Sequence, residues 1–581
     1  MAIPVHKPAR KACPSLPRTR SFHVKFLILC LALLPSALRC PAADISGSIT
    51  CRGKGIAGVV VSDGFAFATT DGRGHYTLES DKRNGYVFYV IPSGYMPRTA
   101  RGSREERLFG GFWQALTSPE DREADERHDF ELRREENDRH IMVFEADPQL
   151  ARRKDTKDME LYKRLFLPRI KEECRKAGKT AIYSTVLGDL SWDNYWYSNR
   201  FTIADYKAFI SKNHKSYGMR HFCVTGNHDN DPSTPHSGET DFRASAAFRK
   251  AVGPNYYSYN IGQIHYVVLD DIVYENRPGK SGKYRKGVVG TRDYETGLTD
   301  EQLAWLEKDL SYVSTSTPVV VSMHAPAWAE TGNFKVTERL TYNKTTERLC
   351  RILQRFHTVH ILSGHRHQTY NMQPERFPSI MEHSVGAVGG NLWGAGGYTG
   401  HPVCVDGTPG GYQVFTINGN DISWQLRTLE GSGNEQFRII DGNTLKHLFL
   451  TDPAWEGIMK ASPNRQDFTS LPDNTILVNV FNYDREWKVR VFEEGRELPV
   501  ERVRCEDPYV TLAFDIPLFK DKKKCSEGNG TKYNTHTFRA VASRADSKVS
   551  VEVTDRFGRT YRSTKQRPID CTLDALAPSG E

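Results

Sequence analysis

Five short polar clusters, each directly after an apolar run, constrain this chain more than any other feature of its sequence. The apolar runs have the length and composition of buried strands, so the polar residues follow at the points where strands end. In an open α/β sheet such loops meet at one edge, and we expect clusters far apart in the sequence to lie together. The clusters are Ala146-Asp147-Pro148-Gln149, Leu187-Gly188-Asp189-Leu190-Ser191, Val224-Thr225-Gly226-Asn227-His228-Asp229, Ser322-Met323-His324-Ala325 and Ser363-Gly364-His365-Arg366-His367.

Between these clusters, stretches typical of strands and helices alternate, as a layered α/β domain requires. We predict strands at Ile141 to Ala146 and at Ala181 to Leu187, and helices at Lys157 to Ala177 and at Ile203 to Ser211. A capping-box sequence that begins at Thr299 predicts one more helix.

The two flanks of this region have a different character. From Ile45 to about Leu132, short β-prone runs are cut by glycine turns, which predicts a small β-sandwich. Further β-prone runs beyond Arg427 predict a C-terminal β domain. A chain of 581 residues is too long for one core. We therefore divide it into a leader at 1–43, an N-terminal β domain at 44–135, an α/β domain at 136–430 and a C-terminal β domain at 431–572.

The leader has the features of a secretory signal. Basic residues come first, an apolar run extends from Phe26 to Leu34, and small residues surround Ala43. The apolar run is too short to span a membrane as a permanent helix. We expect an exported protein, in the periplasm or at the cell surface. A fraying amphipathic terminus and a membrane-associated lipid anchor on Cys40 are the alternatives, and Arg39 is a poor match to the small residue that usually precedes such a cysteine.

The charge balance disfavours a nucleic-acid partner. The chain has 79 Lys and Arg against 71 Asp and Glu, but seven of the basic residues precede Asp44. The rest of the chain is nearly neutral, so the positive charge belongs to the leader. The sequence carries no signature of an oligomeric state.

The cysteines form no obvious framework. Those beyond the leader are scattered, without the close pairs of a zinc knuckle or the density of a disulfide scaffold. In an exported protein Cys505 could pair with Cys525 or with Cys571, and the sequence does not choose between these partners.

The five ordered clusters resemble those of the calcineurin-like metallophosphoesterases. The resemblance extends from His140 to Arg427, and the flanks resemble the small β domains of bacterial members, the N-terminal one being transthyretin-like. It implies a four-layer α/β/β/α sandwich flanked by an N-terminal transthyretin- or Ig-like β-sandwich and a C-terminal β domain. It also implies hydrolysis of a phosphomonoester or phosphodiester in a phosphorylated small molecule, lipid or glycan.

The resemblance implies a dinuclear centre as well, because two divalent ions can clamp a phosphate and activate a water between them. Asp189 is the natural bridge between the ions, since Gly188 before it lets the backbone approach closely. Manganese, iron, zinc and magnesium all remain open as the metal. By resemblance, the first ion would be held by Asp147, Gln149, Asp189 and His367, and the second by Asp189, Asn227, His324 and His365.

His228 follows the ligand Asn227 and, by resemblance, does not bind metal. It would hydrogen-bond the phosphate and protonate the leaving oxygen, a role suited to a group that titrates near neutrality. Asp229 either orients the ring of His228 or caps the turn, and the sequence leaves the two roles equal.

The sequence departs from the common family pattern at two positions. Gln149 replaces the histidine of an Asp-x-His motif, so it either binds the first ion through its amide oxygen or only hydrogen-bonds a metal-bound water. Trp192 stands where purple acid phosphatases have a tyrosine ligand, which disfavours a ferric site. His365 and His367 would share one face of an extended segment, with Arg366 pointing away.

The pocket walls are less well defined by the sequence. The glycine-rich segment Gly386 to Gly397, with Asn391 and Trp393, is the best candidate for a substrate-facing wall. Trp192, Trp196, Tyr256, Tyr257 and Trp393 are more often core residues than substrate platforms. Two rivals to the enzyme remain: a metal-free binding protein on the same fold, and a carbohydrate-binding surface protein whose β domains do the main work.

Overall fold

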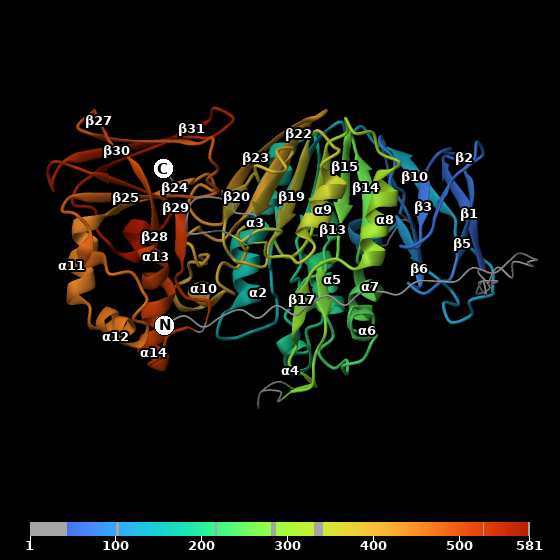
Figure 1. The fold of residues 1–581 in the computed structure, drawn as a ribbon, viewed down its shortest axis with the longest axis horizontal. Helices are drawn as coiled ribbons and strands as arrows, with labels where there is room; N and C mark the ends of the chain where they lie inside the picture. The colour runs from blue at the N-terminus through green and yellow to red at the C-terminus, as the bar shows by residue number, and fades with distance from the viewer. Residues whose placement is uncertain are drawn as a thin grey trace, which may run out of the picture. The chain divides into compact units, whose positions relative to one another are not determined.

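The structure is a computed structural model of the chain, and it describes residues 43–99, 104–214, 218–279, 286–329, 341–526 and 528–578. Figure 1 shows three successive groups of elements: an N-terminal group of strands, a central α/β group and a C-terminal group of strands and helices. The predicted leader lies outside the described residues except for its last position, Ala43.

The N-terminal domain is a sandwich of two small sheets that share a hydrophobic core. Buried and exposed side chains alternate along its strands. In the strand His75–Ser80, Tyr76 and Leu78 are buried, and His75 at its start is exposed. This is the β-sandwich expected at this end of the chain. Its elements are β1 (Ala43–Cys51), β2 (Lys54–Gly55), β3 (Val60–Ser62), β4 (Phe67–Thr69), β5 (His75–Ser80), β6 (Tyr86–Tyr89), β7 (Tyr95–Pro97), β8 (Trp113–Ala115), β9 (Glu126–Arg127) and β10 (Phe130–Arg134), with helix α1 (Arg104–Phe109) before β8.

The central domain contains two large sheets. The first has the order β13-β12-β11-β22-β23, and the second has the order β14-β15-β18-β19-β21-β20. The first is built from β11 (Arg139–Glu145), β12 (Ala181–Val186), β13 (Arg220–Cys223), β22 (Gly411–Asn418) and β23 (Asp421–Thr428). The second is built from β14 (Tyr257–Ile261), β15 (Ile264–Val268), β18 (Val319–Ser322), β19 (Val359–Ser363), β20 (Tyr370–Met372) and β21 (Ile380–Ser384), and a separate hairpin comprises β16 (Ile272–Tyr274) and β17 (Tyr294–Thr296).

The two sheets pack face to face because β11 has apolar residues on both faces. Met142 and Phe144 enter the core between the sheets, and Val143 enters the core beneath the helices on the other side. Between the sheets, the ring of Phe222 stacks on that of Tyr259 with 3.7 Å between centroids. The result is the expected order of helix, sheet, sheet and helix.

Helices cover the outer face of each sheet. The helices of this domain are α2 (Asp158–Leu161), α3 (Leu167–Ala177), α4 (Trp196–Asn199), α5 (Ile203–Asn213), α6 (Thr240–Ala244), α7 (Ala246–Val252), α8 (Asp300–Leu310), α9 (Thr346–Leu353) and α10 (Gly394–Thr399). The helix predicted at Lys157 to Ala177 is present, with a π-helical turn at Tyr162–Phe166 that joins α2 to α3. The helix predicted from Thr299 is also present, because the Thr299 side chain accepts a hydrogen bond from the Gln302 N–H.

The C-terminal domain contains two four-stranded sheets, with orders β24-β25-β29-β28 and β27-β26-β30-β31. It also contains helices that the β-domain prediction did not include. The strands are β24 (Phe437–Asp441), β25 (Thr475–Val480), β26 (Lys488–Glu493), β27 (Arg496–Leu498), β28 (Glu501–Glu506), β29 (Tyr533–Val541), β30 (Lys548–Thr554) and β31 (Thr560–Gln566), and the helices are α11 (Gly442–Thr451), α12 (Pro453–Ala461), α13 (Pro508–Val510), α14 (Ile516–Lys522) and α15 (Leu573–Leu576).

The N-terminal sandwich is joined to the central domain by a continuous core. One hydrophobic cluster contains residues of both domains, including Val61 and Trp305. The Trp305 indole N–H donates to Ser62 Oγ at 3.3 Å, and the Tyr256 hydroxyl donates to the Gly64 carbonyl at 2.8 Å. Removal of the sandwich would therefore expose apolar surface of the central domain.

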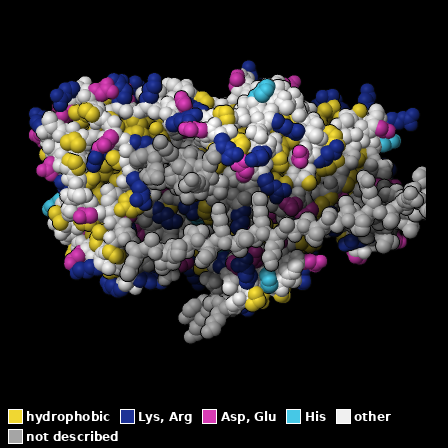
Figure 2. All heavy atoms as spheres, in the orientation of Figure 1, with side chains coloured by type: hydrophobic (Ala, Val, Ile, Leu, Met, Phe, Trp, Pro, Cys, Tyr) yellow, Lys and Arg dark blue, Asp and Glu magenta, His cyan; other side chains and the backbone are white. Residues whose placement is uncertain are grey.

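On the face shown in Figure 2, Lys and Arg side chains are interspersed with Asp and Glu over the described surface. Among the described helices, none has the length and apolar character needed to cross a bilayer. Each of the described cysteines is unpaired, including Cys505, Cys525 and Cys571, so the pairing considered from the sequence is absent.

Candidate metal centre

The five polar clusters meet at one edge of the central domain because their strands are parallel within each sheet. In the first sheet β11, β12 and β13 run parallel, and in the second sheet β15, β18 and β19 do so. Each cluster follows one of these strands, so the carboxyl ends of both sheets bring their polar loops together.

The loops leave the strands with an unusual backbone. Asp147, Gln149, Asp189, His365 and His367 all have positive φ, between 40° and 65°. This left-handed conformation is uncommon for residues with a side chain and is concentrated at functional sites. The extended geometry predicted for His365 and His367 is therefore wrong. A tight turn, instead of an extended strand, directs both rings toward the same site.

Glycines allow these loops to pack against the polar side chains. A Cβ atom on Gly188 would lie 2.4 Å from His324 Nδ1, and one on Gly226 would lie 2.3 Å from Asp189 Oδ1. A Cβ atom on Gly364 would lie 2.5 Å from Asp147 Oδ2. Any side chain at these positions would displace a predicted ligand, which extends the expectation made for Gly188 to two further glycines.

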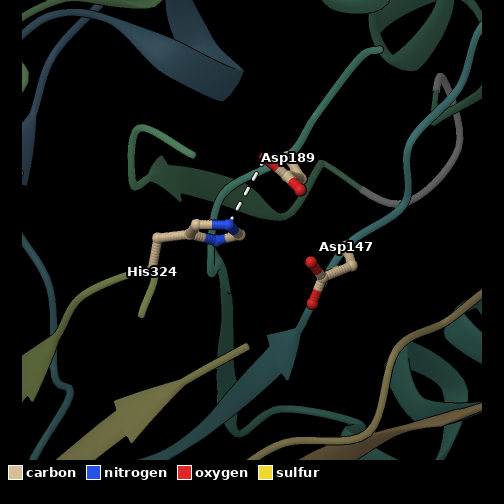
Figure 3. Close-up of side chains that lie close together, drawn as sticks. All are labelled: Asp147, Asp189 and His324. Atoms are coloured by element: carbon tan, nitrogen blue, oxygen red, sulfur yellow. Dashed lines mark ion pairs between the residues drawn. The ribbon is translucent and has the colours of Figure 1, made fainter. Parts of the chain in front are cut away.

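Asp147, Asp189 and His324 form the centre of the site (Figure 3). Each offers a ligand atom, and these atoms lie within 4.8 Å of one another. His324 Nε2 lies 3.4 Å from Asp189 Oδ1, and all three residues are buried. Burial alone would raise the pKa of Asp189, but the charge of the neighbouring imidazoles outweighs it and holds the pKa well below its usual value.

Backbone carbonyls fix the orientation of two imidazoles. His324 Nδ1 lies 2.8 Å from the Leu187 carbonyl, and His367 Nδ1 lies 2.5 Å from the Gly390 carbonyl. Because a carbonyl only accepts, each Nδ1 carries a proton, which leaves each Nε2 as the nitrogen that could bind a metal ion. This is the arrangement that metal-binding histidines adopt.

His365 and Asn227 complete one side of the site. His324 Nε2 has Asn227 Oδ1 at 3.0 Å and His365 Nδ1 at 3.2 Å. On its other side, His365 Nε2 lies 2.8 Å from the hydroxyl of Tyr342. The structure thus places the four residues predicted for the second ion, Asp189 included, around one position.

Two buried oxygens on the opposite side have no hydrogen-bond partner. They are Asp147 Oδ1 and Gln149 Oε1. The amide of Gln149 donates instead through Nε2 to Asp189 Oδ2 at 2.9 Å, which leaves Oε1 as its unused oxygen. His367 Nε2 lies 3.5 Å from Asp147 Oδ1. Buried oxygens without donors are costly, and a cation is the partner that such a set of oxygens and imidazoles fits.

His228 stands beside this centre, with Nε2 4.0 Å from Asp189 Oδ2. Its ring is oriented by Asp193, whose Oδ1 lies 2.8 Å from His228 Nδ1. Arg292 grips the same carboxylate through Nε at 2.5 Å and Nη2 at 2.7 Å. Burial would raise the pKa of Asp193, but the neighbouring His228 and Arg292 lower it, so the carboxylate stays charged.

Asp229 has the capping role and not the ring-orienting one. Its carboxylate accepts from the backbone N–H groups of Gly226 at 2.9 Å, Ser191 at 3.1 Å and Leu190 at 3.2 Å. These bonds tie the loop after β13 to the loop after β12. Asp229 therefore shapes the site through the backbone, and its place beside His228 among the predicted catalytic residues is corrected.

The aromatic residues divide between core and site. Trp196, Trp393 and Tyr257 are almost fully buried, and Tyr256 is also buried. Trp393, which we predicted as a candidate wall residue, donates its indole N–H to the Pro148 carbonyl at 2.9 Å and so supports the loop that carries Asp147 and Gln149. Trp192 is the exception, since it is partly exposed with its ring centroid 5.5 Å from that of His228.

Several residues of the site were not among those predicted from the sequence. Asp193 and Arg292 lie 99 positions apart, and Tyr342 lies outside every cluster. Asp271 supports the His324 loop by accepting from the His324 backbone N–H at 2.8 Å. Asp193 alone was within reach, because it lies four positions after Asp189.

Three family models match the sequence. The model for calcineurin-like phosphoesterase matches residues 161–369, that for the N terminal of calcineurin-like phosphoesterase matches 43–135, and that for the C terminal matches 382–561. The central domain has the layered α/β fold of this class, with buried carboxylates and imidazoles at its strand ends, and the class is that of metal-dependent phosphoester hydrolases. The chain belongs to the calcineurin-like phosphoesterases, and the predicted fold with its two flanking domains is confirmed.

Solved structures show a distant likeness. GAP50, the anchor in the inner membrane complex of Plasmodium, is 12% identical over 51% of this chain and 86% of its own, with a TM-score of 0.29. Phosphopantetheinyl hydrolase from Mycobacterium tuberculosis is 11% identical over 43% and 91%, with a TM-score of 0.27. The 5'-nucleotidase from Candida albicans is 9% identical over 51% and 52%, with a TM-score of 0.27. No curated protein matches the sequence significantly.

Proposed function

We propose that the protein hydrolyses a phosphoester of a phosphorylated small molecule at a centre that holds two divalent ions. The observation that carries this proposal is the pair of buried oxygens without a hydrogen-bond partner, Asp147 Oδ1 and Gln149 Oε1. They lie in a site where His367 Nε2 is 3.5 Å from Asp147 Oδ1 and His324 Nε2 is 3.4 Å from Asp189 Oδ1. Two ions in such a site would neutralise the phosphate charge and lower the pKa of an attacking water.

The ligands fall into two groups that share Asp189. One group contains Asp147, Gln149 and His367, and the other contains Asn227, His324 and His365. Oxygen atoms prevail in the first group and nitrogen atoms contribute more to the second, so the two positions would differ in the metal they prefer.

The chain's own residues supply the remaining chemistry. Because His228 Nδ1 faces Asp193, its Nε2 is the atom available to the substrate, and we assign it the donation of a proton to the leaving oxygen. Arg292 pairs with the Asp193 carboxylate and helps to keep it ionised.

The test combines metal analysis with an assay. The purified protein, measured by inductively coupled plasma mass spectrometry, should retain about two ions per chain, and it should hydrolyse p-nitrophenyl phosphate or bis-p-nitrophenyl phosphate. The ratio of the two rates would separate monoesterase from diesterase activity. A protein that binds no metal and cleaves neither compound would contradict the proposal.

We also propose that the protein is exported, on the strength of the leader at 1–43. Cell fractionation with an antibody against the mature chain, together with N-terminal sequencing, tests this directly. An intact leader on protein found only in the cytoplasm would be the contrary result.

A further inference from the structure

The C-terminal domain reaches the candidate metal centre through a short backbone ladder. The Val405 N–H donates to the His367 carbonyl at 3.2 Å, and the Lys532 N–H donates to the Val405 carbonyl at 2.8 Å. The Asn391 side chain adds a third link, since its Nδ2 donates to the Asn529 carbonyl at 3.0 Å. Residues just before β29 therefore border the loops that carry a predicted ligand.

This border carries two positive charges that no acidic side chain neutralises within the described part of the chain. Lys532 is half-buried, and its ammonium forms no ion pair or side-chain hydrogen bond with a described residue. Arg366 lies between His365 and His367, and its Nε is buried without a hydrogen-bond partner. The backbone ladder places Lys532 beside Val405, whose N–H reaches the carbonyl of His367, the residue after Arg366. Burial, with the charge of Arg366 added, lowers the pKa of Lys532.

Shielded arginines of the C-terminal domain, unlike Lys532, have carboxylate partners. Each of four arginines with little exposed side chain is matched to a carboxylate within 3.0 Å, as expected for charges removed from water. These pairs are Arg438 with Asp507, Arg465 with Glu506, Arg556 with Asp484 and Arg567 with Asp441. Lys532, in the same domain, has no such carboxylate partner among the described residues.

Arg366 is held in place by an aromatic ring. Its guanidinium carbon lies 5.0 Å from the ring centroid of Tyr342, whose hydroxyl lies 2.8 Å from His365 Nε2. The stacking leaves the N–H groups of the guanidinium available in the plane of the fork. Arg292, by contrast, is committed to Asp193 on the His228 side of the site.

We propose that Arg366 and Lys532 bind a second anionic group of the substrate, a phosphate or a carboxylate, beside the phosphate that is hydrolysed. This inference rests on the proposed function and adds a substrate class to it. A planar fork and a compact ammonium together suit a group with two or three anionic oxygens. The C-terminal domain thus contributes to specificity through Lys532.

Two matched substrate pairs test the proposal in the manganese-loaded protein. O-phosphoserine and phosphoethanolamine differ by a carboxylate, whereas fructose 1,6-bisphosphate and fructose 6-phosphate differ by a phosphate. We expect kcat/KM to favour the more anionic member by about tenfold or more, the contribution of a charged hydrogen bond. A preference in one pair alone identifies which anionic group the site accepts.

Variants then locate the preference. Lys532→Met should remove it, mainly through a higher KM for the more anionic member, and Lys532→Arg should restore it. Lys520→Met, which changes an exposed lysine of α14, is the matched control and should keep the preference. In the unaltered protein, a higher salt concentration should also reduce the preference in kcat/KM for the more anionic substrate. This result does not depend on the folding of any variant.

The contrary results are equally defined. Equal kcat/KM values within both pairs, or a preference that survives Lys532→Met, would overturn the anion site. The p-nitrophenyl substrates and the metal analysis decide the proposed function separately, even if the protein hydrolysed none of these four compounds. Calorimetric binding of O-phosphoserine against phosphoethanolamine, with and without Lys532→Met, would then still decide the anion site.

Discussion

The imidazole of His228 is held by the carboxylate of Asp193, whose Oδ1 lies 2.8 Å from His228 Nδ1. Arg292 grips the same carboxylate with two N–H groups and comes within 3.0 Å of the imidazole nitrogen. The ring is therefore fixed from behind, and its Nε2 faces the carboxylate of Asp189. This relationship turns a lone histidine into an oriented proton donor.

Asp193→Asn should lower kcat while leaving metal content unchanged. The amide keeps the shape of the side chain but removes the charge that stabilises a protonated ring. We expect a loss on the order of 10–100-fold, the usual effect of losing a supporting partner. The loss should grow as the leaving group becomes poorer, which aryl phosphates of graded pKa would measure. A loss of the same size for every leaving group, or one matched by the surface change Asp546→Asn, would show a purely structural role.

His228→Ala should lower turnover by about 10²–10⁴-fold, the usual contribution of a general acid, and should largely spare metal binding. Good leaving groups need less protonation, so their hydrolysis should suffer least. Comparison of p-nitrophenyl phosphate with an alkyl phosphate provides the measurement. If both substrates lost equally, His228 would bind phosphate without donating a proton.

Asp189→Asn should be the most damaging single change to the centre. The carboxylate lies between the two groups of predicted ligands, and its loss would leave two cations facing each other without a bridging charge. We expect loss of both bound metal and activity, measured on the same purified sample. Normal metal content with normal turnover would show that Asp189 is not the bridge.

Glu382→Gln tests a buried carboxyl group away from the centre. Glu382 accepts from the Ala327 and Trp328 backbone N–H groups, and burial raises its pKa to about 8. The folded state therefore keeps a proton that the unfolded chain releases above its ordinary value of 4.5. Folding stability should fall as pH rises between these values, by up to about 1.4 kcal/mol per pH unit.

A glutamine at this position does not titrate. The Tm of the variant relative to that of the parent should therefore rise between pH 5 and pH 8, and the difference should stay constant above pH 8. Differential scanning fluorimetry across this range supplies the curve. A gap in Tm that stays constant with pH would mean that Glu382 is ionised throughout.

The strands and their polar loops were predictable because each apolar run has the length of one buried strand. Asp147, Asp189 and His324 could be placed from this pattern and the resemblance, and the structure brings their ligand atoms within 4.8 Å of one another. The left-handed turn at His365 and His367 could not be foreseen, because nothing in a Gly-His-Arg-His sequence indicates that the backbone angle φ of the histidines is positive.

Contacts between distant segments set the other limit. The salt bridge between Arg292 and Asp193 depends on the position of the loop before β17, and no local sequence pattern predicts this position. The helices of the C-terminal domain, by contrast, have a local signal in the sequence. Asp452 caps α12 and Pro453 occupies its first turn, a combination that marks a helix start.

Gln149→His restores the residue that this sequence lacks at a common family position. In the structure Gln149 uses its Nε2 to hold Asp189 and leaves Oε1 buried without a donor. An amide oxygen is a harder and generally weaker ligand than an imidazole nitrogen, so the parent's first site should favour Mn²⁺ or Mg²⁺ over Zn²⁺. The variant should retain metal longer under chelation and should shift toward Zn²⁺ in reconstitution. Metal content after timed exposure to a chelator, followed by competition between Mn²⁺ and Zn²⁺, gives both readouts without an activity assay. The same preference and the same chelator sensitivity in parent and variant would show that Gln149 only hydrogen-bonds a bound water, and the first site would then depend on Asp147, Asp189 and His367.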